Sequence, residues 1–343
     1  MFMIRNIQFL ILAIVLAGCS TSKSLDVVEA PAEFVCRLSN NIEDIGSLES
    51  ISVFDDGFAV IANPSKVMLY GFDGKQKCEI GRPGKARLEY NMPYIIRSCN
   101  DSLYIWSANS MKFISYSKEG RAVAEYSYKS AIRDFLPTDN EIVVYTKGLR
   151  SENVIDIYSK SESSVIISHG VSSEEHKVLL SRTAVAPLSY NNDCISYTQK
   201  GDMSVTSYNV RTCEDVSKLG ISSETFSCAD VEDAEAFLKD RRKRGEYLMN
   251  SSMSLAIIPN GKGDLLLTLE GYEQDAGNRT IDYSNRYFGL YNIKKGKPQA
   301  FYSYNSIGSP YLMSVYDGVL YFIRRKDIEN NDEVYELYRL RLK

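Results

Sequence analysis

Two histidines, His169 and His176, are the residues of this 343-residue chain that could most readily bind a metal or transfer a proton near neutral pH. Their spacing does not match a metal-binding pair on a helix, and no carboxylate-rich turn accompanies them. We therefore interpret both as surface or loop-packing residues, and we expect no metal or other cofactor. The sequence also lacks a Gly-x-Ser-x-Gly nucleophile elbow, a phosphate-binding glycine loop and the carboxylate pattern of an EF-hand.

Charged residues on the strands predicted to be innermost form a second group of candidates. Glu49, Asp134 and nearby asparagines could supply metal ligands from several strands to a hydrolase or lyase, which sequence spacing does not exclude. Arg97 and Arg133 could attract an anion, or Glu49 and Asp134 could neutralise them. We favour the paired, structural arrangement.

The N-terminus indicates export and lipid attachment. Arg5 precedes an apolar run, Ile7 to Ala17, that is about half of the ~20 residues needed to span a bilayer. The run leads into Leu16-Ala17-Gly18-Cys19, which resembles the bacterial lipobox, where a signal peptidase cuts and the cysteine is acylated. The resemblance predicts a signal peptide at residues 1–18, lipid attachment at Cys19 and a lipidated tether at residues 19–31. The alternative is an ordinary secretory signal that contains a cysteine.

Acylation and charge together define the expected surroundings of the domain, residues 32–343. Acyl chains hold a protein on a membrane because each buried CH₂ contributes ~0.8 kcal/mol. Ser20 follows the cysteine, and by resemblance to other lipoproteins the absence of aspartate there favours the outer membrane. We expect the domain to face the periplasm rather than the cell surface. A formal net charge of −4 argues against a nucleic-acid partner.

The other six cysteines could pair in an oxidising compartment. Their spacing is scattered and includes no Cys-x-x-Cys motif, which favours small buried hydrophobic residues over a disulfide framework or a metal site. These cysteines are Cys36, Cys78, Cys99, Cys194, Cys213 and Cys228.

A repeated strand pattern predicts the fold. A short apolar strand follows a turn with Gly, Asn or Asp six times, and each is followed by a second strand containing a tyrosine. The 24 tyrosines, against one tryptophan, suit strands better than helices. The apolar strands begin at Phe58, Leu103, Ile142, Cys194, Leu265 and Leu320, and the tyrosines are Tyr70, Tyr116, Tyr158, Tyr208, Tyr291 and Tyr338.

Further strands flank these pairs, so the repeating unit is four antiparallel strands. Six units at the ~40–50-residue period of propeller blades predict an all-β, six-bladed β-propeller. The last unit ends after its third strand, Glu333–Leu342, while the strand Glu33–Leu38 remains unassigned. Adding this N-terminal strand to the last blade closes the ring and removes an exposed sheet edge. A pair of β-sandwiches is the alternative.

One segment carries a resemblance to a known family. Within Ile80–Tyr90, the residues Gly81, Arg82, Gly84, Glu89 and Tyr90 resemble the Gly-Arg-x-Gly-x-Gly-Pro-x-Glu-Phe/Tyr segment of TolB-like six-bladed propeller lipoproteins of Gram-negative envelopes, whose architecture is NHL-like. The sequence departs from that segment at the usual Gly-Pro, and it lacks the blade signature of TolB itself. The resemblance therefore implies fold and location more than activity.

The connections between predicted strands fall into two sets, which a propeller places on opposite faces. The short-turn face holds the first-to-second and third-to-fourth connections of each blade, such as Asn100–Ser102 and Asp317–Gly318. The long-loop face holds the remaining connections. Because long loops on a rigid frame usually carry binding, we expect recognition on the long-loop face. Its long segments are Ile80–Pro93, Lys147–Asn153, His169–Thr183, Leu219–Asn250, Gly271–Asn285 and Arg325–Asp332.

The largest of these insertions predicts one helix near residues 230–244. Asp230 is its expected cap, the basic run Arg241–Arg244 its C-terminal end, and Gly245 its stop. We expect this helix to lie on the rim of the disc and to cap the mouth of the central channel. The basic run could engage an anion or a lipid headgroup, but we favour a solvated helix end whose charge suits the helix dipole.

Three functions remain open from sequence. The first is an envelope lipoprotein that binds a protein or cell-wall partner through the long-loop face. The second is an accessory lipoprotein that captures a glycan or peptide for uptake, and the third is a metal-dependent hydrolase or lyase of propeller type. The candidate binding residues are Arg82, Glu89, Tyr90, Arg97, Arg133 and Arg150.

Overall fold

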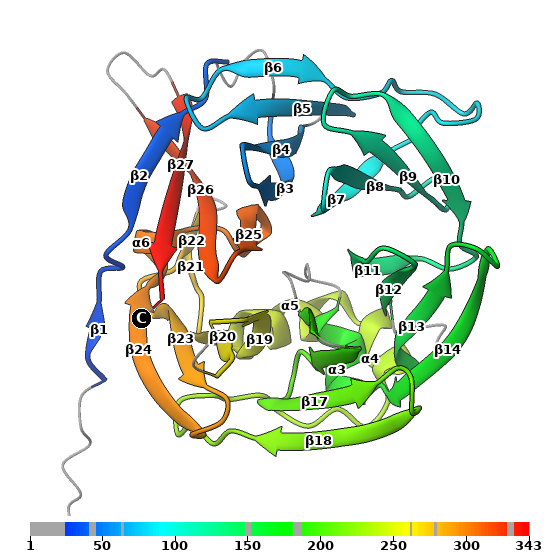
Figure 1. The fold of residues 1–343 in the computed structure, drawn as a ribbon. Helices are drawn as coiled ribbons and strands as arrows, with labels where there is room; N and C mark the ends of the chain where they lie inside the picture. Colours follow the sequence, from blue (N-terminus) through cyan, green and yellow to red (C-terminus); the bar gives the residue numbers. More distant parts are fainter. Residues whose placement is uncertain are drawn as a thin grey trace, which may run out of the picture.

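Antiparallel four-stranded sheets stand around a central channel, each running from an innermost strand to a strand at the rim (Figure 1). Four of these sheets consist of consecutive strands, whereas the last two also take a strand from the N-terminus at their outer edge. The computed structural model describes residues 25–40, 46–62, 65–147, 152–180, 187–191, 193–260, 263–277, 280–327 and 333–342. Cys19, the predicted signal peptide and Arg150 lie outside these residues. The predicted six-bladed β-propeller is confirmed.

The first three blades follow chain order. Blade 1 comprises β3 (Leu48–Phe54), β4 (Gly57–Ala62), β5 (Lys66–Gly71) and β6 (Gln76–Glu79); blade 2 comprises β7 (Pro93–Cys99), β8 (Ser102–Ser107), β9 (Lys112–Ser117) and β10 (Ala122–Ser127); blade 3 comprises β11 (Ile132–Pro137), β12 (Glu141–Thr146), β13 (Asn153–Ser159) and β14 (Ser164–Val171).

The last three blades include two strands from the N-terminus. Blade 4 comprises β15 (Leu188–Asn191), β16 (Cys194–Thr198), β17 (Ser204–Asn209) and β18 (Glu214–Gly220); blade 5 comprises β19 (Met253–Ile258), β20 (Leu265–Gly271), β23 (Arg286–Asn292) and β24 (Lys297–Ser303), with β1 (Val27–Val28) parallel to β24; blade 6 comprises β25 (Met313–Tyr316), β26 (Val319–Asp327), β27 (Glu333–Arg341) and β2 (Glu33–Arg37).

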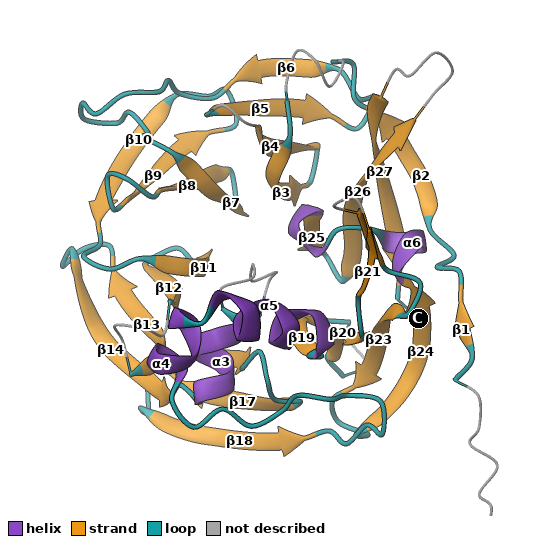
Figure 2. Cartoon of the chain, turned by 180° about the vertical axis from the view of Figure 1, so that it is seen from behind, coloured by secondary structure: helices purple, strands orange, loops and turns teal. Residues whose placement is uncertain are grey.

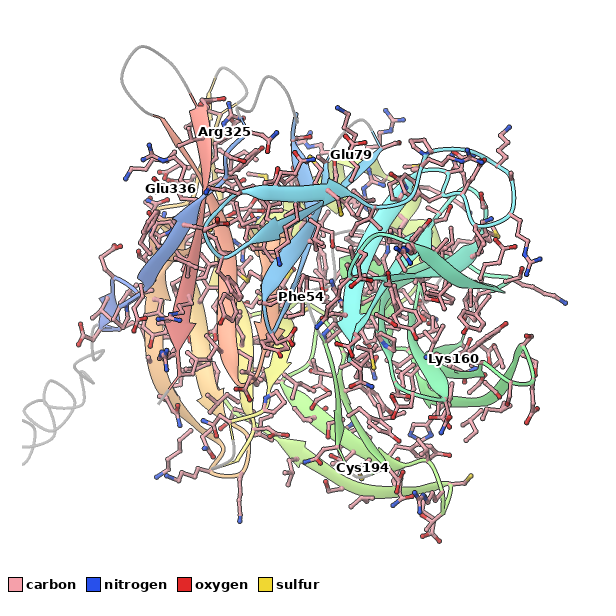
Figure 3. The ribbon with its side chains drawn as sticks, turned by 45° about the horizontal axis from the view of Figure 1, so that its top comes forward. Phe54, Glu79, Lys160, Cys194, Arg325 and Glu336 are labelled. Atoms are coloured by element: carbon pink, nitrogen blue, oxygen red, sulfur yellow. The ribbon has the colours of Figure 1, made fainter. Side chains whose placement is uncertain are left out.

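The ring closes where β2 pairs with β27, as the sequence predicts. The pairing is antiparallel, with Glu33 opposite Arg339 and Phe34 opposite Tyr338. Ion pairs join the same strands, of which two are close: Arg37 Nη2 lies 2.9 Å from Glu336 Oε1, and Arg339 Nε lies 2.8 Å from Glu33 Oε2. Figure 3 shows Glu336 where the two strands meet. The N-terminal strand thus occupies the outer edge of blade 6 and satisfies its backbone groups.

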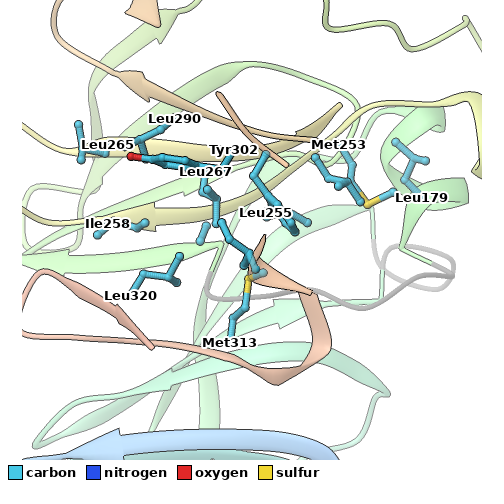
Figure 4. Close-up of a cluster of buried hydrophobic side chains, with 14 of the residues drawn as sticks. Leu179, Met253, Leu255, Ile258, Leu265, Leu267, Leu290, Tyr302, Met313 and Leu320 are labelled. Carbon is cyan, nitrogen blue, oxygen red and sulfur yellow. The ribbon is translucent and has the colours of Figure 1, made fainter. Parts of the chain in front are cut away.

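The core lies between the blades. Every residue of β4 and β19 is buried, because neighbouring sheets cover both faces of these inner strands. One apolar cluster joins blade 5 to blade 6 through Leu255, Leu267, Met313 and Leu320, with Leu179 from outside the blades (Figure 4). Outer strands alternate between covered and exposed residues instead, as in β6. Burial between blades therefore fixes the radial arrangement.

The long-loop face carries most of the helical structure. Figure 2 shows α3 (Glu174–Leu179), α4 (Ala234–Lys239) and α5 (Arg241–Asn250) together over one part of the ring. The same face carries the hairpin of β21 (Gln274–Gly277) and β22 (Thr280–Asp282). Between blades 5 and 6 are α6 (Tyr304–Ile307) and the 3₁₀ turn η1 (Pro310–Leu312). In the described part of the chain, no helix has the length and apolar character to cross a membrane.

The predicted helix near 230–244 is two helices, with boundaries that differ from the expectation. Asp233 caps α4 by accepting a hydrogen bond from Ala236 N, and Asp240 caps α5 by accepting from Arg242 N. The second aspartate interrupts the helix because its carboxylate satisfies backbone N–H groups at a new N-terminus. The basic run therefore begins α5, and Gly245 lies inside that helix.

Contacts from α3 and blade 5 hold the two helices in place. Glu174 Oε2 accepts from Ala234 N at 2.7 Å, and Glu175 Oε1 accepts from Val231 N at 2.9 Å. At the other end, the buried Arg286 donates to the carbonyl oxygens of residues 248 and 249 at 3.0 and 2.8 Å, near the C-terminus of α5. A guanidinium suits this position because the last carbonyls of a helix lack partners within it.

Candidate functional site

A cavity of about 940 Å³ occupies the central channel. Its walls are innermost strands from all the blades, and its rim includes the turn residues Asn100, Asp139, Asn260 and Asp317. Because these turns follow the first strand of their blades, the cavity belongs to the short-turn face. Its volume is within the ~300–1,000 Å³ typical of small-molecule sites. We expected recognition on the long-loop face, so this site is an addition to that expectation.

The ion pair of Arg97 and Asp134 lines the cavity. Arg97 Nη2, on β7, lies 2.7 Å from Asp134 Oδ1, on β11, and the side chains are 15% and 1% exposed. The same carboxylate oxygen accepts from Phe135 N at 2.8 Å, which orients it. We predicted that acidic residues on the innermost strands neutralise the arginines there, and Asp134 does so for Arg97. Asp134 Oδ2 is buried without a hydrogen-bond partner.

Glu49 and Arg133 do not extend this pair. Glu49 is exposed on β3, whereas Arg133 donates to the Tyr94 hydroxyl at 3.5 Å, at the limit of a hydrogen bond. Within the described ranges, no group of three or more His, Cys, Asp or Glu side chains could hold a metal ion. All six cysteines other than Cys19 carry free thiols, and Cys36 is the buried one.

Lys200 is buried near Asp134, in the connection between β16 and β17 on the long-loop face. It follows β16, and its backbone oxygen accepts from Ser254 N at 2.9 Å. Burial lowers the pKa of Lys200 to about 7, and the Asp134 carboxylate opposes this shift. Its Nζ has no hydrogen-bond partner in the described structure. Asp134 therefore experiences two cations, Arg97 and Lys200.

His176 is fully buried against this lysine, so it fits the packing interpretation and not the surface one, although it lies on α3 rather than in a loop. Its Nδ1 accepts from Lys200 N at 2.9 Å, and its ring packs edge-on against Tyr145. Burial lowers the pKa of His176 to about 3, with Lys200 contributing, so the imidazole is neutral. The unrecognised local signal was Ser173, which caps α3 by accepting a hydrogen bond from His176 N and so places His176 on a helix.

His169 fits the packing interpretation, although it lies on a strand rather than in a loop. It is part of β14, and its ring stacks on Tyr208 with 4.0 Å between centroids. Its Nε2 lies 3.0 Å from Asp215 Oδ1, an ion pair only when the imidazole is protonated.

Serines on the inner strands join neighbouring blades, a feature that sequence reasoning missed. Ser314 Oγ of blade 6 accepts from Val53 N at 3.1 Å, and Ser98 Oγ of blade 2 donates to Val53 O at 3.0 Å. Val53 of blade 1 is thus held from both sides. The available signal was the presence of serines on otherwise apolar strands. A buried hydroxyl needs a hydrogen-bond partner, and the backbone of a neighbouring blade can supply it.

Lysines reinforce the turns of the short-turn face. Lys118 Nζ lies 2.6 Å from Asp55 Oδ1 of blade 1 and 2.9 Å from Asp101 Oδ1 of its own blade. These hydrogen bonds raise the pKa of Lys118 and lower that of Asp55. Lys160, labelled in Figure 3, donates to the Tyr104 hydroxyl of blade 2 at 2.7 Å. The turns of the short-turn face are therefore joined between neighbouring blades.

The segment of the TolB-like resemblance is a loop held by hydrogen bonds within it and by hydrogen bonds to side chains of blade 2. Arg82 Nε lies 2.6 Å from Glu89 Oε1, Glu89 Oε2 accepts from Ala86 N at 3.0 Å, and Tyr90 O accepts from Gly84 N at 2.8 Å. A Cβ at Gly84 would lie 1.9 Å from Glu89 Oε2, which explains the glycine. Three predicted binding residues are thus brought together: Glu89 and Tyr90 hold the loop, while the Arg82 side chain is 78% exposed.

The connections of the long-loop face expose large apolar side chains. Within the described residues, the short-turn connections contribute none to the exposed large hydrophobic set. When exposed apolar residues gather on one face, they usually mark a surface that binds a protein, a membrane or a ligand. The long-loop residues are Met92, Met111, Tyr272, Ile281 and Tyr311.

Comparison with known proteins supports the fold. The chain is similar to a putative exported protein from Bacteroides fragilis, with a TM-score of 0.61, 13% identity and coverage of 91% of this chain and 95% of that chain. It is also similar to a DUF4221 family member from Bacteroides vulgatus, with a TM-score of 0.60, 8% identity and coverage of 90% and 98%. No family model matches the sequence, and no curated protein matches it. TolB-like membership stays a prediction beyond the shared six-bladed architecture.

Proposed function

We propose that this protein is an exported, lipid-anchored binding protein of the bacterial envelope that engages a protein partner through its long-loop face. The observation that carries the proposal is the one-sided distribution of exposed apolar side chains in the connections. Met92 is 51% exposed, Met111 44% and Tyr272 45%. Aromatic residues and methionine are enriched where proteins meet, and a rigid ring presents them without a large ordering cost.

The anchoring part of the proposal is supported by the lipobox resemblance at Leu16–Cys19. Acylation of Cys19 would hold the propeller at a membrane, and Ser20 favours the outer membrane with the domain facing the periplasm. The first strand that pairs with the propeller, β1, begins at Val27, eight positions after Cys19, so the tether between a lipid on Cys19 and the domain would be short.

In-cell photocrosslinking from two long-loop positions tests this function. A photoreactive residue at Met111 or Tyr272 should trap an envelope protein, whereas one at Val216, exposed on the rim strand β18, serves as a matched control. Mass spectrometry of the adduct identifies the partner. Adducts of equal yield from Val216, or none from either long-loop position, would contradict the proposal.

A Cys19→Ser variant tests anchoring separately. Without the acylated cysteine, the protein should no longer appear in the membrane fraction.

Capture of a small ligand is a second candidate function, and the central cavity favours it. The cavity is on the short-turn face, so a ligand there and a partner on the long-loop face would not compete for surface. Glycan and peptide were both expected ligand classes for an accessory uptake lipoprotein. Binding of either by the purified mature protein, measured by calorimetry, tests this candidate.

A further inference from the structure

The inner part of the central cavity offers hydrogen-bond donors that the described protein does not use. Arg97 donates from Nη1 to Ile96 O at 2.8 Å and from Nη2 to Asp134 Oδ1 at 2.7 Å. A guanidinium has five N–H donors in a fixed fork, so others remain. The Arg97 side chain lines the cavity and is 15% exposed. An acceptor entering the cavity can therefore reach Arg97.

The charges around Arg97 favour an anionic acceptor. Asp134 is shared by Arg97 and the buried Lys200, whose ammonium interacts electrostatically with the same carboxylate. One carboxylate facing two basic groups leaves the inner end neutral to positive around pH 7. Carboxylates form short, charge-assisted hydrogen bonds with guanidinium groups, which makes them well suited to this end.

The rim of the cavity carries the opposite charge. Asp139 of blade 3 and Asp317 of blade 6 line it and are exposed. Asn100 Nδ2 donates to Asp139 Oδ1 at 2.6 Å, which orients that carboxylate without neutralising it. Among the described lining residues, the cation at the rim is Arg341, which lies 3.8 Å from Glu33 Oε1 and so shares its charge with a carboxylate outside the cavity. Lys160, outside the lining, donates to the Asp139 backbone oxygen at 3.3 Å and offsets part of the charge of Asp139, whereas Asp317 keeps its negative charge at the rim. Polarity thus reverses between the inner end and the rim.

We propose that the cavity binds a short linear peptide with its free α-carboxylate on Arg97 and its α-ammonium toward Asp139 and Asp317. This inference rests on the second candidate function, the capture of a small ligand. A neutral glycan offers hydroxyl groups but neither terminal charge, whereas a peptide offers both. The apolar wall residues Leu136, Ile257 and Val315 suit side chains between the two termini. The volume, about 940 Å³, accommodates more than one residue.

The test presents the purified mature protein, in detergent, with a mixed-sequence tetrapeptide library in three forms: free, C-amidated and N-acetylated. Retained peptides are identified by mass spectrometry, and their affinities are measured by calorimetry. We expect amidation to weaken binding at least tenfold and acetylation to weaken it by a smaller factor, because Asp139 and Asp317 are solvent-exposed. Equal retention of free and amidated peptides would overturn the proposal, and so would no retention of any form.

Variants locate the binding. Arg97→Gln should abolish the difference between free and amidated peptides. Arg37→Gln is the matched control, because Arg37 also pairs with a buried carboxylate, Glu336, but lies on β2 outside the cavity. If Arg97→Gln fails to fold, the comparison of ligand forms still decides the matter, since it needs no variant.

A neutral glycan, maltotetraose, separates this inference from the function on which it rests. Maltotetraose binding without peptide binding would refute the peptide while supporting ligand capture. Binding of neither would refute the peptide and remove the support for ligand capture.

Discussion

At the scale of single residues, the centre of the molecule contains charges that are buried at a cost. Lys200 and Asp134 are at most 1% exposed, and the latter keeps one carboxylate oxygen without a partner. Partly satisfied polar groups in a core lower stability, and they persist where something other than stability requires them. Their position beside the central cavity is consistent with a role in ligand binding.

Lys200→Met should stabilise the fold, and more so at pH 6 than at pH 9. The folded-state pKa of Lys200 is lowered to about 7, against 10.5 for the free side chain. The penalty, of the order of a few kcal/mol, is therefore complete below pH 7 and disappears as pH rises through 10.5. Urea unfolding of both proteins at the two pH values measures the difference. If the difference in unfolding free energy between the two proteins is the same at pH 6 and pH 9, Lys200 stays charged in the folded protein over this range.

At the scale of elements, strands were predictable and helices were less so. The apolar strands predicted to begin at Cys194 and Leu265 match β16 and β20, because apolar runs between turn residues are local signals. The break at Asp240 was missed because a favourable N-cap competes with continued helix, and the sequence pattern fits both outcomes. The burial of His176 was missed because it depends on packing against Lys200, which is distant in the chain.

The two possible caps can be compared directly. Asp240→Ala should destabilise α5 by about 1 kcal/mol, because Arg242 N and Lys243 N lose their acceptor. Trypsin should then cut faster within the basic run Arg241–Arg244. Asp230→Ala is the control, since Asp230 is exposed and precedes both helices rather than capping either. Faster cleavage in Asp230→Ala than in Asp240→Ala would favour the single helix expected from sequence.

At the scale of the whole molecule, the ring depends on contacts between the two ends of the chain. The match between an incomplete last unit and a spare N-terminal strand was visible in sequence because it is a matter of counting. The cavity was not visible, because its lining comes from every blade and is assembled by closure of the ring. The candidate site is therefore a product of the global fold, whereas the blades are products of local pattern.

Two truncations of the mature chain separate closure from simple edge protection. Removing residues through Ala30 deletes β1, which forms a short parallel pair with β24, and should leave cooperative unfolding with a small loss of stability.

Removing residues through Leu38 also deletes β2, its antiparallel pairing with β27 and the Arg37–Glu336 ion pair. The unpaired β27 then becomes an exposed edge, and Glu336, 3% exposed in its side chain, loses its closest cation. We expect the second truncation to broaden the thermal unfolding transition and to promote aggregation, as followed by calorimetry and light scattering. A sharp transition at the temperature of the first truncation would mean that the six blades hold together without the N-terminal strand.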